Sequence, residues 1–301
     1  MEIKNKVNRN GDTTAYKIFS VLNYTLLIGM ALLCVLPMVN IFAISLSSAN
    51  KAEAGMVGLW PQEFTLRAYS FALGKELFWK SMLVTIERTV LGTAFGMFLT
   101  VTSAYALSKD SKIFKARRYY VWFFFFTMLF SGGLIPSFLM VYYTGIYDSL
   151  WALVIPGAVS VWNTILMLNF FRQHPKELED AACIDGAGHW TILWQIFIPI
   201  SKPALATVSL FTIVAHWNSW FDGMLYIKQV EHQPMQTYLR SLLNIDIARF
   251  LTGQQLQEVQ KMSGKTLRAA QIFIAALPIL AIYPFLQKYF TKGLVLGSVK
   301  E

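Results

Sequence analysis

Residues 177–188 read Glu177-Leu178-Glu179-Asp180-Ala181-Ala182-Cys183-Ile184-Asp185-Gly186-Ala187-Gly188. This stretch is rich in carboxylates and in helix-forming residues, and it lies between apolar runs long enough to cross a bilayer. Carboxylates are costly inside hydrocarbon, so a membrane chain keeps a group of them only where water or another protein meets it. We therefore expect the function of the chain to depend on this segment.

The composition indicates the solvent around that segment. Of the 301 residues 55% are hydrophobic and only 14% are charged, and the mean hydropathy is +0.46. Soluble domains carry about 25% charged residues, so the composition predicts an integral membrane protein. The net charge of +9 is explained by basic residues beside the spans, which attract anionic lipid heads, and nucleic acid is not an expected partner.

Six apolar runs are long enough to cross a bilayer, which takes about 20 helical residues. They lack the alternation of barrel strands, and inside hydrocarbon a helix satisfies its own backbone polar groups. The sequence therefore predicts an all-α integral membrane bundle. The expected spans are 16–47, 78–108, 119–145, 150–172, 204–227 and 269–290.

The basic residues predict the orientation, because Lys and Arg are retained on the cytoplasmic side. Five of them lie between Lys109 and Arg118, whereas residues 144–149 contain none. Both termini are therefore expected in the cytoplasm. The predicted transmembrane domain is 16–293, with cytoplasmic tails at 1–15 and 294–301, a cytoplasmic loop at 175–203 and an extracytoplasmic loop at 228–268.

The residue patterns do not favour an enzyme. The four histidines are scattered without the i, i+4 spacing of a helical metal site, and the two cysteines are expected in different surroundings. Gly264-Lys265-Thr266 resembles the end of a phosphate-binding loop, but Val259 stands where that loop needs its first glycine. We expect no catalytic residue, no metal and no cofactor in this chain. ATP, with its Mg²⁺, would have to be bound by partner subunits.

The polar stretch predicts a helix, a glycine turn and a second helix. Pro175 suits a helix first turn and the acidic residues after it suit the positive end of the helix dipole, so the first helix should run from Pro175 to about Ile184. Apolar residues then repeat at helical spacing until Pro199 and Pro203. Such a rigid knob fits a groove in a partner protein. An amphipathic re-entry into the next span is the alternative.

The same segment resembles the signature loop of the permease subunits of binding-protein-dependent ATP-binding-cassette importers. That pattern is Glu-Ala-Ala, three residues, Gly, nine residues, Ile, one residue, Leu-Pro. The chain has Asp180-Ala181-Ala182, Gly186, Ile196 and Ile198-Pro199 at the matching positions, with Asp replacing Glu and Ile replacing Leu. The resemblance implies that this loop couples the chain to an ATPase. The expected coupling residues are Glu177, Glu179, Asp180, Ala181, Ala182, Asp185, Gly186, Gly188 and Pro199.

Four further segments look like the carbohydrate-uptake branch of these permeases. They are Leu129-Phe130-Ser131-Gly132-Gly133-Leu134-Ile135-Pro136, Trp162-Asn163, Trp217-Asn218-Ser219-Trp220-Phe221 and Tyr283-Pro284-Phe285-Leu286-Gln287-Lys288-Tyr289-Phe290 with Gly293 and Gly297. The resemblance implies a type I importer fold with six spans in a bacterial cell membrane. It also implies four kinds of partner, namely a homologous second permease, two cytoplasmic ATPases, an extracytoplasmic solute-binding lipoprotein and a carbohydrate, with oligosaccharides favoured.

Two sets of residues are candidates for contacts with the sugar and with its carrier. Aromatic and polar side chains near spans four and five suit a sugar pathway, although polar contacts between helices would explain them equally. They are Asn163, His216, Trp217, Asn218, Trp220 and Asp222. In the outer loop Tyr238, Arg240 and Asn244 are candidates for contact with the binding protein, and a lid over the bundle is the alternative.

Glu87 and Arg88 are adjacent on the second span and point about 100° apart, so each is expected to pair with a neighbouring helix rather than with the other. Two other functions stay open at this point. One is an importer of the same architecture for a solute such as a peptide, and the other is an ion-coupled secondary transporter.

Overall fold

The computed structural model describes residues 14–244 and 264–298, and every element in those ranges is helical. The described residues form two compact units, one of 14–72 with 264–273 and one of 73–244 with 274–298. The predicted all-helical class is therefore confirmed for the described part of the chain. The predicted tail 1–15, the loop 228–268 and the tail 294–301 each fall partly outside the described residues.

The first unit contains α1 (Thr14–Ser45), α2 (Ala49–Glu53), α3 (Arg67–Leu73, whose last residue belongs to the second unit) and the beginning of α16 (Gly264–Ser298). α1 is apolar around its whole circumference and most of its side chains are exposed, as expected for a helix that faces lipid. A hydrogen bond of 2.7 Å between the Ser45 and Tyr69 hydroxyls ties its end to α3.

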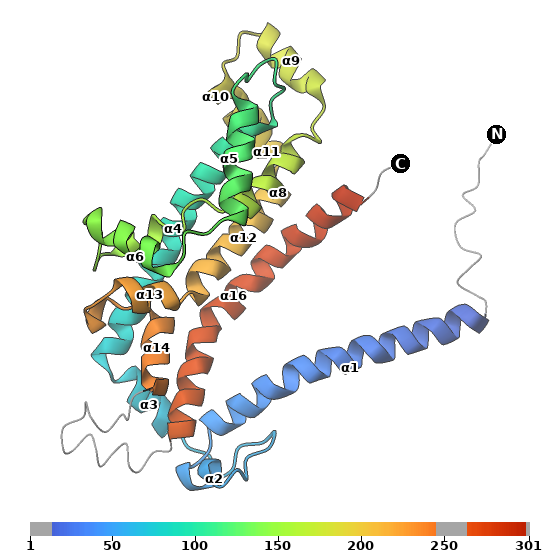
Figure 1. Ribbon diagram of the computed structural model, residues 1–301. Helices are drawn as coiled ribbons and strands as arrows, with labels where there is room; N and C mark the ends of the chain where they lie inside the picture. Colours follow the sequence, from blue (N-terminus) through green and yellow to red (C-terminus); the bar gives the residue numbers. More distant parts are fainter. Residues whose placement is uncertain (1–13, 245–263, 299–301) are drawn as a thin grey trace. The chain divides into compact units, whose positions relative to one another are not determined.

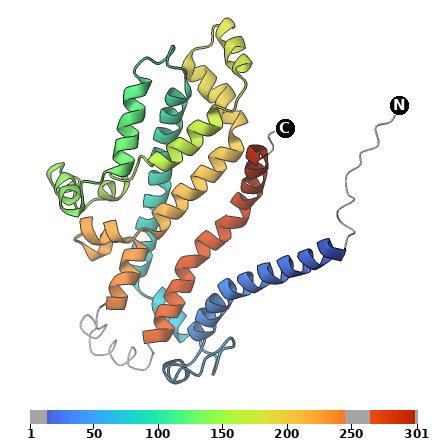
Figure 2. The ribbon, with the colours of Figure 1, turned by 45° about the vertical axis from the view of Figure 1, so that its right-hand side comes forward.

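The second unit is built on three helices that lie side by side, α4 (Glu76–Ser108), α8 (Val161–Phe171) and α12 (Lys202–Asn218) (Figures 1 and 2). Glycines on α4 allow the close approach. A Cβ on Gly92 would meet the imidazole of His216 at 2.6 Å, and one on Gly96 would meet the carbonyl oxygen of Ala158 at 3.1 Å. Small residues serve packed membrane helices in this way because lipid supplies no hydrophobic drive between them.

Shorter helices occupy the two ends of this unit. α9 (Lys176–Ile184) and α10 (His189–Ile192) lie at one end, and α13 (Phe221–Tyr226) and α14 (Met235–Asn244) lie towards the other (Figure 1). A buried apolar cluster beneath α9 and α10 contains Ala104, Phe171, Ala182, Ile192 and Phe197, among others. A second cluster joins α4 to α12, α14 and α16 through Phe78, Trp217, Met235, Leu239 and Ala275.

Three helices in the described residues, α1, α4 and the part of α16 up to Ile282, are long and apolar enough to cross a membrane. Two further candidates are pairs of helices bent by more than 40°. α5 (Arg117–Leu129) meets α6 (Leu134–Tyr143) at 117°, and the helical run His189–Ile200 meets α12 at 86°. The count of six spans stays a prediction.

Three of the predicted spans are interrupted rather than continuous. The third breaks between α5 and α6 at Gly132 and Gly133, where Gly133 has a φ of +90°. The fourth divides into α7 (Leu150–Val154) and α8 around Pro156 and Gly157, and the fifth divides into α12 and α13 at Ser219 and Trp220. Glycine in the left-handed region and proline without an N–H both end a helix, so apolar length alone does not ensure one straight span. α16, by contrast, continues to Ser298, beyond the predicted end at residue 290.

Candidate functional site: the α9–α10 loop and the end of α4

The predicted helix in the polar stretch is present as α9, Lys176–Ile184. Pro175 lies at the N-cap instead of inside the first turn, so α9 begins one residue later than predicted. Glu177 and Glu179 lie in the first turn. Their negative charge there stabilises the helix through its dipole.

A Schellman motif ends α9. Two backbone hydrogen bonds across the last turn of the helix define it. The Ala187 N–H donates to the Ala182 carbonyl at 2.9 Å, and the Gly186 N–H donates to the Cys183 carbonyl at 3.1 Å. Gly186 has a φ of +81°, the left-handed conformation that this motif needs. The predicted glycine turn therefore has a defined geometry in which Gly186 reverses the chain.

The second helix is longer and less regular than predicted. α10 is followed without a break by a π-helical turn, η1 (Leu193–Phe197), and by α11 (Ile198–Ile200). The helix therefore continues past Pro199 and ends at Ile200, with Ser201 as its C-cap. The Ile198 N–H donates to the Leu193 carbonyl, five residues back. Pro199 supplies no N–H and its ring crowds the preceding turn, which is a physical reason for the wider π turn. Pro203 lies in the first turn of α12, where a missing N–H costs little.

The two faces of α9 have different surroundings. At 100° per residue Glu177, Asp180, Ala181 and Ile184 share one side, and all four are exposed, Ile184 by 87%. Ala182 lies on the opposite side and is buried in the apolar cluster. An exposed isoleucine among carboxylates is suited to a groove that is apolar at its base and polar at its rim.

Glu179 lies on the inner side of α9 and pairs with Lys109, the residue that follows α4. The Nζ–Oε1 distance is 2.6 Å, and the Lys109 and Glu179 side chains are 6% and 18% exposed. The ammonium also lies over two rings, 3.9 Å from the centroid of Tyr105 and 4.5 Å from that of Phe197. Burial lowers the pKa of Lys109, and the Glu179 carboxylate opposes that shift by favouring the charged form.

A second ion pair joins the same two segments at the surface. Lys176 Nζ lies 2.8 Å from Asp110 Oδ2, and these side chains are 77% and 61% exposed. The Lys176 ammonium lowers the pKa of Asp110, and the Asp110 carboxylate raises the pKa of Lys176. Exposed pairs of this kind stabilise little because water screens them.

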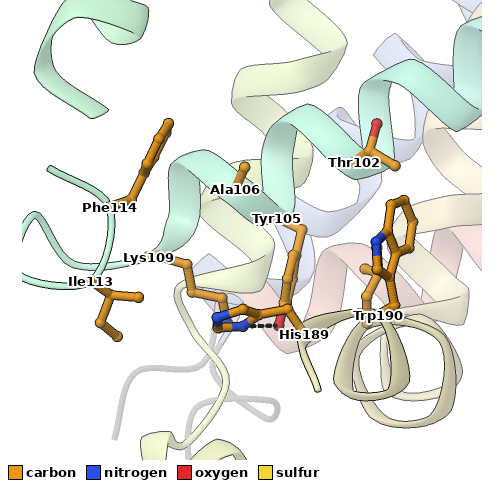
Figure 3. A pocket seen from close by; sticks show the side chains of 9 residues that line it. Thr102, Tyr105, Ala106, Lys109, Ile113, Phe114, His189 and Trp190 are labelled. Atoms are coloured by element: carbon orange, nitrogen blue, oxygen red, sulfur yellow. Dashed lines mark hydrogen bonds between the residues drawn. The ribbon is translucent and has the colours of Figure 1, made fainter. Parts of the chain in front are cut away.

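A pocket of about 370 Å³ lies between the end of α4, the loop after it and α10 (Figure 3). The Tyr105 hydroxyl and His189 Nδ1 meet inside it at 3.4 Å, and Trp190 lies beside Thr102. Its lining is mostly apolar. The residues that line the pocket are Thr102, Tyr105, Ala106, Lys109, Ile113, Phe114, His189, Trp190 and Leu193.

The six residues predicted for a sugar pathway lie on α8, on α12, at Trp220 between α12 and α13, and at Asp222 on α13. The Asn163 amide donates to Thr212 at 3.2 Å, the Trp217 indole donates to the Ala275 carbonyl at 3.1 Å, and the buried ring of His216 faces Gly92. Asp222 pairs with Arg88 of α4 and accepts from the Ser219 hydroxyl at 2.8 Å. Asn218 is exposed.

Arg88 therefore pairs with α13 rather than with its neighbour Glu87, as expected from their directions on the helix. Arg240 extends its guanidinium over the ring of Trp220, 4.1 Å from the centroid, so one residue from each predicted set meets at this end of the unit. Tyr238 is buried in the second apolar cluster. Asn244 ends α14, and its side chain lies outside the described residues. Contact with a sugar or with a binding protein stays a prediction for both sets.

Two residues in this region were not predicted from the sequence. In the sequence Lys109 is one of five basic residues in a loop, and its pairing with a residue 70 positions away leaves no local pattern. Ile184 could have been found, because it is a large apolar residue seven positions after Glu177, on the helix face that also carries Asp180.

Most of the residues described above lie in a segment that matches a known protein family. Residues 92–296 match the model of the binding-protein-dependent transport system inner membrane component. The chain belongs to this family. It is thus a component of a multi-pass membrane transport system, and the resemblance found in residues 180–199 is confirmed.

Individual members of the family are similar over nearly their whole length. The chain is 39% identical to the polygalacturonan/rhamnogalacturonan transport system permease protein YtcP of Bacillus subtilis, over 94% of this chain and 99% of that protein. It is 40% identical to protein LplC of the same organism, over 96% and 97%. Among solved structures, a bacterial transporter involved in the import of the acidic polysaccharide alginate matches with a TM-score of 0.83 and 33% identity, covering 95% of this chain and 99% of that one.

Proposed function

We propose that this chain is a permease subunit of an ATP-binding-cassette importer that moves an oligosaccharide across the bacterial cell membrane. The exposed face of α9, held by the Schellman turn at Gly186, carries the proposal because it offers a rigid, water-facing surface on a lipid-embedded chain. A separate ATPase would receive that face in a groove. Its closure would displace α9, and rigid helices would pass the displacement to the spans.

The family and the relatives support the proposed partners. An extracytoplasmic binding protein would deliver the solute, a homologous permease would complete the pathway, and two ATPases would bind ATP and Mg²⁺. The substrate is proposed to be an acidic oligosaccharide, because one relative is named for polygalacturonan and rhamnogalacturonan and the alginate importer carries an acidic polysaccharide.

The proposed topology has six spans with both termini in the cytoplasm. This places the loop 175–203 inside, where ATPases are, and the loop 228–268 outside, where a binding protein would be. Cysteine labelling from the outside tests it, in a background where Cys34 and Cys183, both free, are replaced by Ser. Lys228→Cys should react with an impermeant maleimide in intact cells, and Glu177→Cys should react only after the membrane is opened.

Transport by the purified complex in proteoliposomes tests the function itself. ATP hydrolysis should rise when the binding protein is loaded with oligogalacturonides, and less or not at all with neutral oligosaccharides. Stimulation by peptides alone would assign the chain to another solute. Solute uptake that follows an ion gradient without ATP would overturn the importer proposal.

A photoreactive cross-linker on Ile184→Cys tests the docking face. Capture of an ATPase chain is the expected result, and cross-linking to lipid alone would contradict it.

A further inference from the structure

The inner face of α9 makes a contact that an ATPase-docking role does not explain. Glu179 points about 160° away from Glu177 and about 100° away from Asp180 on the helix. Its carboxylate meets the Lys109 ammonium at 2.6 Å. Lys109 itself is almost fully buried, and its charge is held between that carboxylate and the rings of Tyr105 and Phe197. A buried ammonium whose surroundings offer one carboxylate and two ring faces is fixed in place, because moving it away would leave a charge uncompensated.

We propose that the Lys109–Glu179 pair is the joint through which α9 moves α4, and that Glu179 acts on α4 rather than on the ATPase. This inference rests on the proposed importer function. It makes Lys109 and Glu179 positioning residues for transport and divides the acidic residues of the signature loop into two groups. Glu177 and Asp180 face the ATPase, and Glu179 faces the interior of its own chain.

α4 is suited to carry the motion onward. It is one continuous helix of 33 residues, or about 50 Å at 1.5 Å per residue. Near its other end Arg88 pairs with Asp222 of α13, and the Thr85 hydroxyl accepts from the Met235 N–H at 2.7 Å at the start of α14. One turn further, Lys80 Nζ lies 3.0 Å from Glu231. A displacement of α4 therefore reaches the segment 231–235 in the loop proposed to meet the binding protein.

The covalent route from α10 to α12 is a softer connection. It passes through the π-helical turn η1 and an 86° bend at Ser201. Irregular turns of this kind yield under load where a straight α-helix does not. The non-covalent step from α9 to α4 is shorter, buried and charged, so we assign it the larger share of the coupling.

A double-mutant cycle in the complete complex tests the joint, with Lys109→Met, Glu179→Gln and both together. Each single variant should keep its ATPase chains on purification. Each should lower the stimulation of ATP hydrolysis by loaded binding protein about tenfold or more, within the range usual for coupled sites. Because the two residues act as one unit, the double variant should lose no more than the worse single variant.

Two further variants serve as controls. Lys109→Arg keeps the cation, and cavities of about 370 and 640 Å³ that Lys109 lines leave room for the larger side chain, so it should keep most of the stimulation. Asp110→Asn breaks the neighbouring exposed pair with Lys176 and should change stimulation by less than about twofold. If Lys109→Met fails to assemble, the stimulation of ATP hydrolysis in Glu179→Gln and in Lys109→Arg still tests the proposal, because only Glu179→Gln should lose it.

Three outcomes would overturn the proposal. They are losses that add in the double variant, release of the ATPase chains by Glu179→Gln, and normal stimulation in both single variants. Release of the ATPase chains would assign Glu179 to the interface with the ATPase. Failure of the importer proposal looks different, because the unaltered complex would then show no stimulation by any sugar-loaded binding protein.

Discussion

The glycine turn after α9 allows backbone strain to be tested apart from side-chain space. Gly186 has a φ of +81°, whereas Gly188 has a φ of −75°. A Cβ built on either residue meets no heavy atom within 4 Å. Gly186→Ala and Gly188→Ala therefore add the same methyl group to open space and differ in backbone conformation.

The expected magnitudes follow from that difference. An L residue in the left-handed region costs roughly 1–2 kcal/mol. The Schellman turn in Gly186→Ala should therefore open about five to thirty times more often, at tenfold per 1.4 kcal/mol. Gly188→Ala should leave opening unchanged or slow it, because it restricts the unfolded chain without native strain. Gly186→Asn should lie between the two, since Asn tolerates this region better than Ala.

Hydrogen exchange on the purified complex measures this opening, because the Gly186 and Ala187 amides are the donors of the turn. Peptides covering 182–192 should exchange faster in Gly186→Ala, and stimulation of ATP hydrolysis by loaded binding protein should fall with it. Equal acceleration in Gly188→Ala, or none in Gly186→Ala, would refute the assignment of strain to Gly186.

Three further perturbations have definite expected results. Asp180→Lys combined with Asp185→Lys reverses the charge on two exposed residues of the loop. The double variant should lose uptake of labelled sugar while the chain still reaches the membrane fraction. Normal uptake at normal abundance would contradict the docking role. Asp222→Asn leaves Arg88, which is 3% exposed, without its counter-charge. It should lower the free energy of unfolding, measured by thermal unfolding, by about 3–5 kcal/mol. Glu87→Gln, at the exposed neighbour of Arg88, should change that free energy by less than about 0.5 kcal/mol. Burial lowers the pKa of His174, whose Nε2 lies 2.9 Å from the Ser201 hydroxyl. The unfolded chain therefore binds the proton more readily, and the stability of the protein should fall as pH drops below about 6.5. His174→Gln should flatten that part of the profile of stability against pH, and an unchanged profile would show that another group titrates.

Local signals predicted the elements around the site, and tertiary pairing lay beyond them. α9 and its turn follow from Pro175, the acidic first turn and Gly186, all within twelve residues of one another. Two of the three breaks in the spans have visible causes, Gly132-Gly133 and Pro156-Gly157, but counting apolar residues does not weigh them. The third break, at Ser219 and Trp220, contains neither a glycine nor a proline. Lys109 and Glu179 are different, because only the packing of α4 against the loop shows that one loop cation is buried.

The two faces of α9 are under different geometric constraints, and neighbouring acids show it. Asp180 points to solvent, so a partner's groove can adapt to the length of its side chain, and the family pattern has Glu where this chain has Asp. Glu179 must reach a fixed ammonium inside the same chain, and an Asp there would be shorter by one carbon–carbon bond, about 1.5 Å. Glu179→Asp should therefore lose stimulation almost as Glu179→Gln does, whereas Asp180→Glu should keep it. Tolerance of Asp at 179 together with failure of Glu at 180 would reverse the assignment of the two faces, and ATP hydrolysis of the two variants measured side by side decides it.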